Sequence, residues 1–272
     1  MRAKKSLGQH FLKSEKALTT IVKAGDVGAK DTILEIGPGT GVLTEKLLAA
    51  SCQVLAIEKD DKLYEFLKTK FEKEIKNEKL RLIHDDILEF DLSKLEAKTY
   101  KLVANIPYNI TGAILKKFLE ADYQPEKIVF LVQKEVAKRI VGRPLGGSAS
   151  KWEKESVLSI SVKAYGVPRY VETVKAGSFV PVPKVDSAII VIENISKNFF
   201  QSASQRITEK EFFHTVRTGF KSKRKKLSSN LLTIVAKNKV QEAFQKLNLD
   251  NNLRAEDIGI EIWRKLAYSL SS

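Results

Sequence analysis

The sequence predicts an α/β fold: a doubly wound, mostly parallel sheet of seven strands, followed by a small all-helical domain. Two observations lead to this prediction. Over roughly the first 190 residues, short apolar runs alternate with helical patterns, which is typical of strand–helix–strand units. From about residue 209 onward only helical patterns remain, which favours a separate helical domain at that end.

Seven segments are expected to form the strands. Runs such as KIVFLV are apolar throughout, which suits a strand that is covered on both faces. The expected strands are 32–36, 53–58, 79–84, 101–104, 127–132, 157–164 and 187–192. Helical patterns fill most gaps between the early strands, for example 42–50 and 62–75.

A polar stretch without a clear period, 196–208, is expected to be a linker. Four helical patterns follow it, at 209–221, 224–237, 240–247 and 257–270. We therefore expect two domains, 1–195 and 196–272, with the boundary near residue 195.

Charge is the unusual feature of the composition. The 272 residues include 47 Lys and Arg against 33 Asp and Glu, a net charge of +14. An excess of that size indicates a polyanionic partner, either nucleic acid or an anionic membrane face. The alternative is a soluble protein from a Lys-rich proteome. With 43% apolar and 29% charged residues, collagen-like, mucin-like and disordered chains are excluded.

Several other classes are excluded by what the sequence lacks. A single cysteine, Cys52, allows no intrachain disulfide and no Cys-based zinc site. His10, His84 and His214 are widely spaced and match no metal motif. No apolar run reaches 18 residues, and the basic N-terminal stretch has no apolar signal core. The expectation is a cytoplasmic protein without a bound metal or a membrane contact.

A glycine-rich segment, EIGPGTG at 35–41, follows an expected strand and opens an expected helix. Glycines permit a tight turn there and let the backbone approach a ligand closely. The dinucleotide fingerprint is G-x-G-x-x-G, whereas this segment has G-x-G-x-G after a glutamate. That form resembles the first motif of the Rossmann-like methyltransferases, whose cofactor is S-adenosylmethionine. A tight turn without a ligand is the alternative.

Acidic residues end the next two strands. Glu58 ends the second strand, where a carboxylate can accept hydrogen bonds from both hydroxyls of a ribose. Asp85 and Asp86 follow the third strand, at the ligand edge of an open α/β sheet. One of these two carboxylates could accept a hydrogen bond from an adenine amino group. A helix cap or a solvated turn is equally consistent with them.

The tetrapeptide NIPY at 105–108 follows the fourth strand and is the most informative in the chain. The exocyclic nitrogen of adenine is a poor nucleophile because its lone pair is delocalised into the ring. The side-chain oxygen of Asn105 and the carbonyl of Ile106 are two neutral acceptors that favour a pyramidal nitrogen, and Pro107 rigidifies the turn. Tyr108 offers a face for base stacking. A plain proline turn is the alternative.

The ordered motifs resemble those of the bacterial small-subunit rRNA adenine N6-dimethyltransferases, a family within the rRNA adenine dimethyltransferases. The resemblance extends over nearly the whole chain. Its motifs are GQHFL at 8–12, EIGPGTG at 35–41, Glu58, DDIL at 85–88, NIPY at 105–108, QKEVA at 133–137 and FVPVPKVDS at 179–187. It implies a Rossmann-like, class I methyltransferase fold with S-adenosylmethionine as cofactor.

The resemblance also implies roles for individual positions. The cofactor contacts would be His10, Leu12, Gly37, Glu58, Asp86 and Asn105. The family pattern favours Asp86 over Asp85 for the adenine of the cofactor. Asn105 would also contact the target amine, and Tyr108 and Phe179 would sandwich the flipped adenine. From physics alone, Phe179 before a Pro-rich turn is more typical of a core residue.

Two segments depart from the family pattern. His10 stands where the family often has Asn; both side chains can form hydrogen bonds, and the histidine could add a pH dependence. The stretch RPLGGSASKWEKE at 143–155 differs from the commoner family pattern in an expected substrate-facing loop.

Two segments are basic and contain no acid, which suits contacts with RNA phosphates. One is 1–14, with Arg2, Lys4, Lys5 and Lys13; the other is 216–226, with Arg217, Lys221, Lys223, Arg224, Lys225 and Lys226. Such contacts would give affinity and salt dependence, while RNA would be recognised by its shape. Solvated helix faces are the alternative.

The resemblance implies dimethylation of two adjacent adenosines in a loop near the 3′ end of small-subunit (16S) rRNA. The partner would be the immature small ribosomal subunit, and the role small-subunit biogenesis. Nothing in the sequence suggests more than a monomer. Two alternatives stay open. One is the sister class that methylates large-subunit rRNA and confers macrolide resistance, against which QKEVA and FVPVPKVDS argue. The other is a mainly non-catalytic assembly factor, against which the intact NIPY and Glu58 argue.

Overall fold

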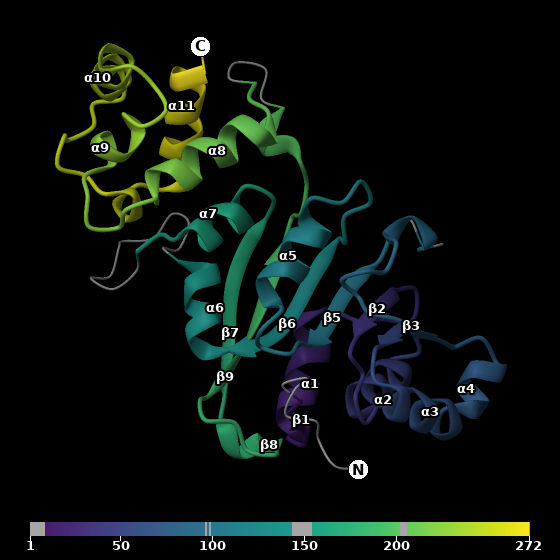
Figure 1. Cartoon of the computed structure of the whole chain (residues 1–272). Coiled ribbons are helices and arrows are strands. Elements are labelled where there is room, and N and C mark those ends of the chain that lie inside the picture. The colour runs from purple at the N-terminus through teal and green to yellow at the C-terminus, as the bar shows by residue number, and fades with distance from the viewer. Residues whose placement is uncertain (1–8, 96, 98, 143–153, 202–205, 272) are drawn as a thin grey trace. The chain divides into compact units, whose positions relative to one another are not determined.

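The structure, a computed structural model, describes residues 9–95, 97, 99–142, 154–201 and 206–271. Its contacts divide the chain into two compact units, each described here by itself (Figure 1). The first unit comprises Met1–Ala137 and Pro168–Ile195, and the second comprises Lys138–Val167 and Ser196–Ser272. The second unit thus includes an internal segment in addition to the C-terminal helices. The domain ranges 1–195 and 196–272 stay a prediction.

The first unit is built on a seven-stranded sheet with the order β4-β3-β2-β5-β6-β9-β7. Five strands run parallel: β2 (Thr32–Ile36), β3 (Gln53–Glu58), β4 (Leu80–His84), β5 (Lys101–Asn105) and β6 (Lys127–Gln133). Strand β9 (Ser187–Glu193) pairs antiparallel with β6, and β7 (Val167–Val174) forms the edge. The predicted mostly parallel sheet of seven strands is confirmed.

Helices join most of the parallel strands, because a parallel connection needs a crossover segment. Helix α2 (Val42–Ala49) lies between β2 and β3, α3 (Asp61–Lys70) and α4 (Glu72–Lys76) lie between β3 and β4, and α5 (Thr111–Leu119) lies between β5 and β6. Helix α1 (Glu15–Ala24) precedes β2, and α6 (Lys134–Val141) follows β6. The 3-10 turn η2 (Leu92–Lys94) lies between β4 and β5, and η3 (Ala176–Ser178) lies between β7 and β8. The central strand β6 is buried along its apolar length, so the core of this unit lies on both faces of the sheet.

The strand expected at 157–164 is wrong, because this segment forms helix α7 (Val157–Lys163). Ser156 starts the helix: its Oγ accepts a hydrogen bond from the Ser159 amide at 3.0 Å, and the Ser159 Oγ accepts one from the Ser156 amide at 2.8 Å. The period-two pattern of apolar residues concealed this capping box. The true strand, β7, contains Pro168, which an edge strand tolerates.

The other six expected strands begin and end within one residue of the observed bounds. Two expected helices differ most from the observed ones. The pattern at 62–75 is interrupted at Phe71 into α3 and α4, and the pattern at 224–237 reduces to α9 (Leu227–Leu231). Phe71 turns its ring toward the glycine-rich segment: a Cβ on Gly41 would lie 2.5 Å from the Phe71 Cε2 atom. Gly41 also has a φ of +80°, which L side chains rarely adopt.

A two-stranded antiparallel pair was not expected from the sequence. Strand β1 (Phe11–Leu12) pairs with β8 (Phe179–Val180), so that Leu12 lies opposite Phe179. This pair joins segments that are far apart along the chain and brings the FVPVPKVDS segment beside the GQHFL segment.

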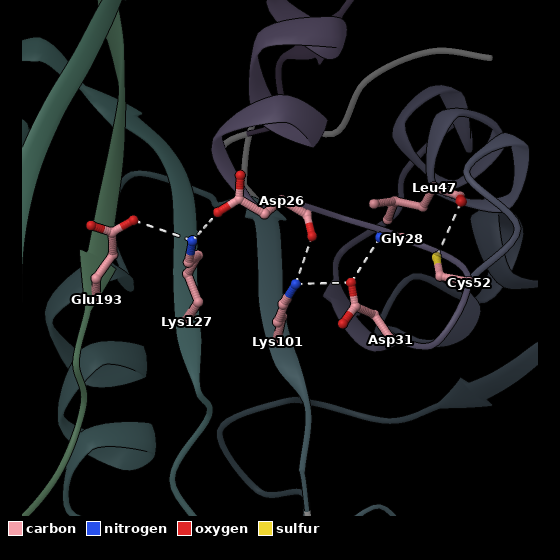
Figure 2. A network of polar contacts seen from close by, with 8 residues as sticks. All are labelled: Asp26, Gly28, Asp31, Leu47, Cys52, Lys101, Lys127 and Glu193. Carbon is pink, nitrogen blue, oxygen red and sulfur yellow. Dashed lines mark hydrogen bonds and ion pairs between the residues drawn. The ribbon is translucent and has the colours of Figure 1, made fainter.

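Charged side chains hold the amino ends of β5 and β6 (Figure 2). The Lys101 Nζ donates to the Asp31 Oδ2 at 2.8 Å and to the Asp26 carbonyl at 2.7 Å. The Lys127 Nζ pairs with the Asp26 carboxylate and, at 3.2 Å, with Glu193. These contacts tie the loop after α1 to the sheet at the edge opposite the carboxyl ends of the strands.

The second unit is helical in its C-terminal part, as predicted. Its helices there are α8 (Glu209–Gly219), α9, α10 (Lys237–Lys246) and α11 (Ile260–Ser271), with the 3-10 turns η4 (Asn198–Phe200) and η5 (Ala255–Asp257). Trp263 is fully buried and stacks on Phe220, with the ring centroids 5.5 Å apart. Among the described residues, no helix is long and apolar enough to cross a membrane.

Candidate active site

A cavity in the first unit lies at the carboxyl ends of β2, β3, β4 and β5, where ligands bind in open α/β sheets. Its lining includes nearly all the residues that the sequence singled out: His10, Leu12, Gly37, Glu58, Asp85, Asp86, Asn105, Ile106 and Tyr108. Phe179 is the exception, since it does not belong to the lining. The fold therefore brings the glycine-rich segment and NIPY to one place.

The glycine-rich segment is a tight turn between β2 and α2. Gly37, Gly39 and Gly41 all have positive φ, and the Gly37 amide donates to the Ile57 carbonyl at 2.9 Å. This bond fixes the start of the turn to β3. The backbone of the segment therefore forms one wall of the cavity in a conformation that favours glycine.

Glu58 ends β3 and is 5% exposed. Its Oε1 accepts a hydrogen bond from the Asp60 amide at 2.8 Å, and its Oε2 accepts one from the Gly39 amide at 3.1 Å. Burial raises the pKa of this carboxyl, whereas the backbone N–H groups oppose that rise. The carboxylate is thus held in a fixed orientation, and each oxygen keeps a lone pair for a further donor.

Asp85 and Asp86 both line the cavity after β4. The Asp86 Oδ1 accepts a hydrogen bond from the Leu88 amide at 2.9 Å, and its Oδ2 accepts one from Lys59 at 2.5 Å. Burial raises the pKa of Asp86, but the bonds to Lys59 and Leu88 outweigh it and lower the pKa overall. Asp86 is therefore ionised at neutral pH. The neighbouring Asp85 carboxylate accepts a hydrogen bond from the Asp86 amide at 2.7 Å.

Asn105 ends β5 and turns its amide nitrogen toward the N-terminal segment. The Nδ2 atom donates to the His10 carbonyl at 3.2 Å, which fixes the side-chain amide and leaves its oxygen as an acceptor on the other side. The Ile106 amide donates to the Leu131 carbonyl at 3.3 Å, and no hydrogen bond to the Ile106 carbonyl occurs among the described residues. Two neutral acceptors therefore remain at this position.

Tyr108 is partly buried and lies against His10. The two rings are stacked, with centroids 5.7 Å apart and an interplanar angle of 23°. The Tyr108 hydroxyl is hydrogen bonded to the Ser187 Oγ at 2.8 Å, and the His10 Nδ1 to the Pro181 carbonyl at 2.7 Å. Ser187 and Pro181 belong to the FVPVPKVDS motif, but the sequence assigned a role in the site only to Phe179 of that motif.

Phe179 is fully buried and belongs to the hydrophobic core of the first unit. Its strand β8 pairs with β1, which contributes Leu12 to the cavity. The physical expectation that Phe179 is a core residue agrees with this position, and its role in stacking on a base stays a prediction.

Glu35 lines the cavity and was not singled out by sequence reasoning beyond its place in EIGPGTG. It is 1% exposed, and the Thr44 Oγ1 donates to its Oε2 at 2.7 Å. Burial raises the pKa of Glu35 to about 8, although the Thr44 bond opposes the rise. The raised pKa follows from the burial of Glu35 between the sheet and α2, and the spacing of residues in the sequence does not reveal that burial.

The second basic segment lies in the second unit, where Arg217, Lys221, Lys223, Arg224, Lys225 and Lys226 are all exposed. Within the described part of the chain, none of these six forms an ion pair with a carboxylate. The Asn230 Nδ2 holds the turn by donating to the carbonyls of Gly219 at 2.6 Å and Ser222 at 3.1 Å. Of the four Lys and Arg residues in the first basic segment, only Lys13 is described. Arg2, Lys4 and Lys5 lie outside the described residues, as does 143–153 of the divergent loop.

No cluster of His, Cys, Asp and Glu side chains in the described ranges has the arrangement of a metal site. Cys52 is a free, buried thiol whose pKa burial raises to about 11. It does not line the cavity.

The architecture has close relatives among solved structures. A dimethyladenosine transferase from Plasmodium falciparum superposes with a TM-score of 0.76 and 26% identity, covering 94% of this chain and 96% of that one. The 23S rRNA methyltransferase ErmE gives a TM-score of 0.75 at 24% identity, covering 96% and 100%, and shares the fold. The sheet and its cavity define a class I, S-adenosylmethionine-dependent methyltransferase fold, as predicted.

Sequence comparison narrows the class to a family. The family model described as ribosomal RNA adenine dimethylase matches residues 1–271. A protein of Dehalococcoides mccartyi named ribosomal RNA small subunit methyltransferase A is 42% identical, covering 98% of this chain and 88% of its own length. A protein of the same name from Nostoc sp. is 38% identical, covering 98% and 97%. This chain belongs to the ribosomal RNA adenine dimethylase family, which confirms the predicted resemblance.

Glu35 generates a prediction about stability. Its pKa is about 8 in the folded chain against an ordinary value of 4.5, so the unfolded chain loses this proton first as the pH rises. The stabilising effect of the proton is complete below pH 4.5 and is lost as the pH rises toward 8, with a slope of up to about 1.4 kcal/mol per pH unit. In Glu35→Gln, which keeps an acceptor for Thr44, this slope disappears. Urea unfolding of the wild type and of Glu35→Gln between pH 5 and pH 8 measures how the free energy of unfolding depends on pH. Parallel pH profiles for the two proteins would contradict a raised pKa of Glu35.

Glu58 generates a prediction about cofactor binding. Glu58→Ala is expected to weaken S-adenosylmethionine binding more than tenfold, because a charged acceptor is worth roughly 1.5–3 kcal/mol. Since burial raises the pKa of Glu58, affinity falls as the pH is lowered toward that pKa, and Glu58→Gln removes this pH dependence. Calorimetric titration gives the affinities, with Glu65→Ala on the exposed side of α3 as control. Equal affinity of the Glu58→Ala and control variants would contradict the ribose assignment.

Proposed function

We propose that this chain transfers methyl groups from S-adenosylmethionine to the exocyclic amines of two adjacent adenosines near the 3′ end of small-subunit rRNA. The observation that carries the proposal is the cavity in which Glu58 and Asp86 lie with Asn105, Ile106 and Tyr108. The names of the relatives from Dehalococcoides mccartyi and Nostoc sp. support small-subunit rRNA as the substrate. The proposed setting is small-subunit biogenesis in the cytoplasm, with the immature subunit as partner and the enzyme as a monomer.

The lining of the cavity fits S-adenosylmethionine. Glu58 would accept hydrogen bonds from the ribose hydroxyls with an orientation already fixed by two backbone N–H groups. Asp86 would accept one from the adenine amino group, and the positive-φ turn at Gly37 admits a close approach of the backbone. His10, Leu12 and Asn105 complete the expected contacts. When bound, the cofactor supplies a methyl group attached to a sulfonium sulfur, and the neutral thioether that remains is a good leaving group without help from a metal.

The chain's own contribution to the reaction is positioning and two neutral acceptors. The Asn105 side-chain oxygen and the Ile106 carbonyl would accept hydrogen bonds from the target amine and favour its pyramidal form. The bond from Asn105 to the His10 carbonyl holds this acceptor in place. Tyr108 would stack on the adenine and orient its amine.

Two methyl groups on one base require that a monomethylated adenine still binds. In each transfer, the nitrogen lone pair would form the N–CH3 bond as the S–CH3 bond breaks, which releases the neutral thioether. The methylated nitrogen would then be positively charged and acidic, so it would lose one proton to water. Rotation about the exocyclic bond can then present the remaining N–H to a neutral acceptor. A site with two neutral acceptors and no charged base accommodates both forms, which supports dimethylation.

Methyl transfer to ribosomal particles tests the proposal. The chain is incubated with labelled S-adenosylmethionine and either small-subunit or large-subunit particles that lack these modifications, followed by nucleoside mass analysis. Dimethyladenosine in the small-subunit rRNA is the expected product. Label only in large-subunit rRNA would move the chain to the resistance-type class, and no label in either would contradict the catalytic proposal.

Asn105→Ala separates catalysis from binding. Loss of one acceptor for the reacting amine is expected to lower the rate of methyl transfer by about 100-fold or more. Binding to the small-subunit particle, measured by co-sedimentation, should change little because phosphate contacts dominate affinity. If particle binding and assembly effects persist in this variant, a role as an assembly factor exists beside catalysis. Retention of the full rate would contradict the assignment of Asn105.

We propose that the second basic segment, 216–226, called the basic turn from here on, contacts RNA phosphates. Its six cations lack a carboxylate partner among the described residues, so they are available to a polyanion. The Asn230 bonds to Gly219 and Ser222 give the turn a defined shape. RNA would be recognised there by shape and charge.

Removal of charge at Lys223, Arg224, Lys225 and Lys226 by alanine should flatten the salt dependence of RNA binding. Each lost phosphate contact lowers the slope of log K against log salt by about 1. The matched control removes Lys62, Lys68, Lys73 and Lys79, four exposed lysines of the first unit, and should leave the slope steeper. Equal slopes for the two quadruple variants would contradict RNA contact by this segment and favour the alternative, a solvated surface.

A further inference from the structure

The FVPVPKVDS segment meets the cavity residues through polar groups and not through its aromatic ring. Phe179 is fully buried in the core and does not line the cavity. The Ser187 Oγ and the Pro181 carbonyl, by contrast, are hydrogen bonded to Tyr108 and to His10, which do line it. What this segment gives to the site is therefore a hydroxyl and a carbonyl.

Ser187 is well placed to fix the position of the Tyr108 side chain. It is fully buried, and it lies opposite Gln133 in the ladder that joins β9 to β6. The neighbouring Asp186 carbonyl accepts the Lys134 amide at 3.0 Å, which continues the pairing. The hydroxyl of Ser187 is thus attached to the rigid sheet, whereas Tyr108 lies on the turn after β5.

Tyr108 has two free torsion angles, and a ring on a turn can rotate about both unless something holds it. The 2.8 Å bond from its hydroxyl to Ser187 fixes the far end of the ring. Burial raises the pKa of Tyr108, so the hydroxyl stays protonated at neutral pH and keeps the bond.

His10 is held in a similar way from the same segment. A carbonyl oxygen only accepts, so the His10 Nδ1 carries the hydrogen in its 2.7 Å contact with Pro181. The imidazole then lies nearly parallel to the Tyr108 ring, with 23° between the planes. Two rings from distant parts of the chain are aligned by one segment.

We propose that Ser187 and the Pro181 carbonyl are positioning groups: they hold Tyr108 and His10 as a stacked pair of rings at the cavity, and the target adenine stacks on Tyr108. Ser187 acts through Tyr108 and does not touch the base. Stacking on a fixed ring orients the amine toward Asn105, because a planar base that lies flat on the ring has little freedom left. The inference deepens the proposed function and rests on it.

A double-mutant cycle between Ser187 and Tyr108 tests the proposal. Methyl transfer to small-subunit particles is measured for the wild type, Ser187→Ala, Tyr108→Phe and the double variant, with kcat and KM for the RNA determined separately. Ser187→Ala should lower kcat/KM by about fivefold to tenfold, while S-adenosylmethionine affinity by calorimetry stays within about twofold. In the Tyr108→Phe background, which lacks the hydroxyl, Ser187→Ala should have no further effect.

A matched cycle distinguishes positioning from general destabilisation. Tyr100 is also buried, and its hydroxyl donates to the Tyr123 carbonyl at 3.1 Å, but it does not line the cavity. Ser187→Ala should keep its full effect in the Tyr100→Phe background. If Ser187→Ala does not fold, Ser187→Cys replaces it, since a thiol is of similar size and a weaker partner.

Two results would overturn the inference. One is an effect of Ser187→Ala that is equally large with and without the Tyr108 hydroxyl. The other is a loss of cofactor affinity that accounts for the whole decrease in kcat/KM. A wild-type protein that transfers no methyl group to any particle would instead refute the proposed function, so the two failures are distinguishable.

Discussion

The parallel ladder between β2 and β5 is the constraint on which the site depends. It pairs Ile33 with Lys101, Leu34 with Leu102 and Glu35 with Val103, although the chain forms β3 and β4 between these two strands. Strand order therefore reverses at β2, and the two turns that follow β2 and β5 leave the sheet side by side. One turn is the glycine-rich segment and the other is NIPY. Their proximity follows from the pairing of the strands and needs no direct bond between the motifs.

Backbone groups orient the polar side chains of the cavity. Glu58 is held by the amides of Gly39 and Asp60, and Asn105 by the carbonyl of His10. The sheet and its turns fix these backbone groups, so the acceptors are oriented before a ligand arrives. Preorganised acceptors need little rearrangement when a ligand binds.

Much of the first unit could be predicted from the sequence, because buried parallel strands are short apolar runs with distinct ends. The prediction failed at 157–164, where the cap formed by Ser156 and Ser159 makes a helix, and at β7, whose proline and charges conceal an edge strand. The motifs located the cavity. The sequence did not reveal the roles of Glu35 and the Ser187 hydroxyl. The pKa of Glu35 depends on its burial beneath α2, and the Ser187 hydroxyl meets a tyrosine 79 residues away, and no local pattern records either fact.

The interruption of the helical pattern at Phe71 also affects the glycine-rich segment at 35–41. Its ring fills the space beside Gly41, so the shape of that turn depends on a residue between two surface helices. Positions 41 and 71 are therefore not free to vary independently. A smaller side chain at 71 would leave a hole beside Gly41, and a larger one would collide with the turn. Among homologous sequences, the size of the residue at 71 should accordingly stay within narrow limits wherever position 41 is glycine.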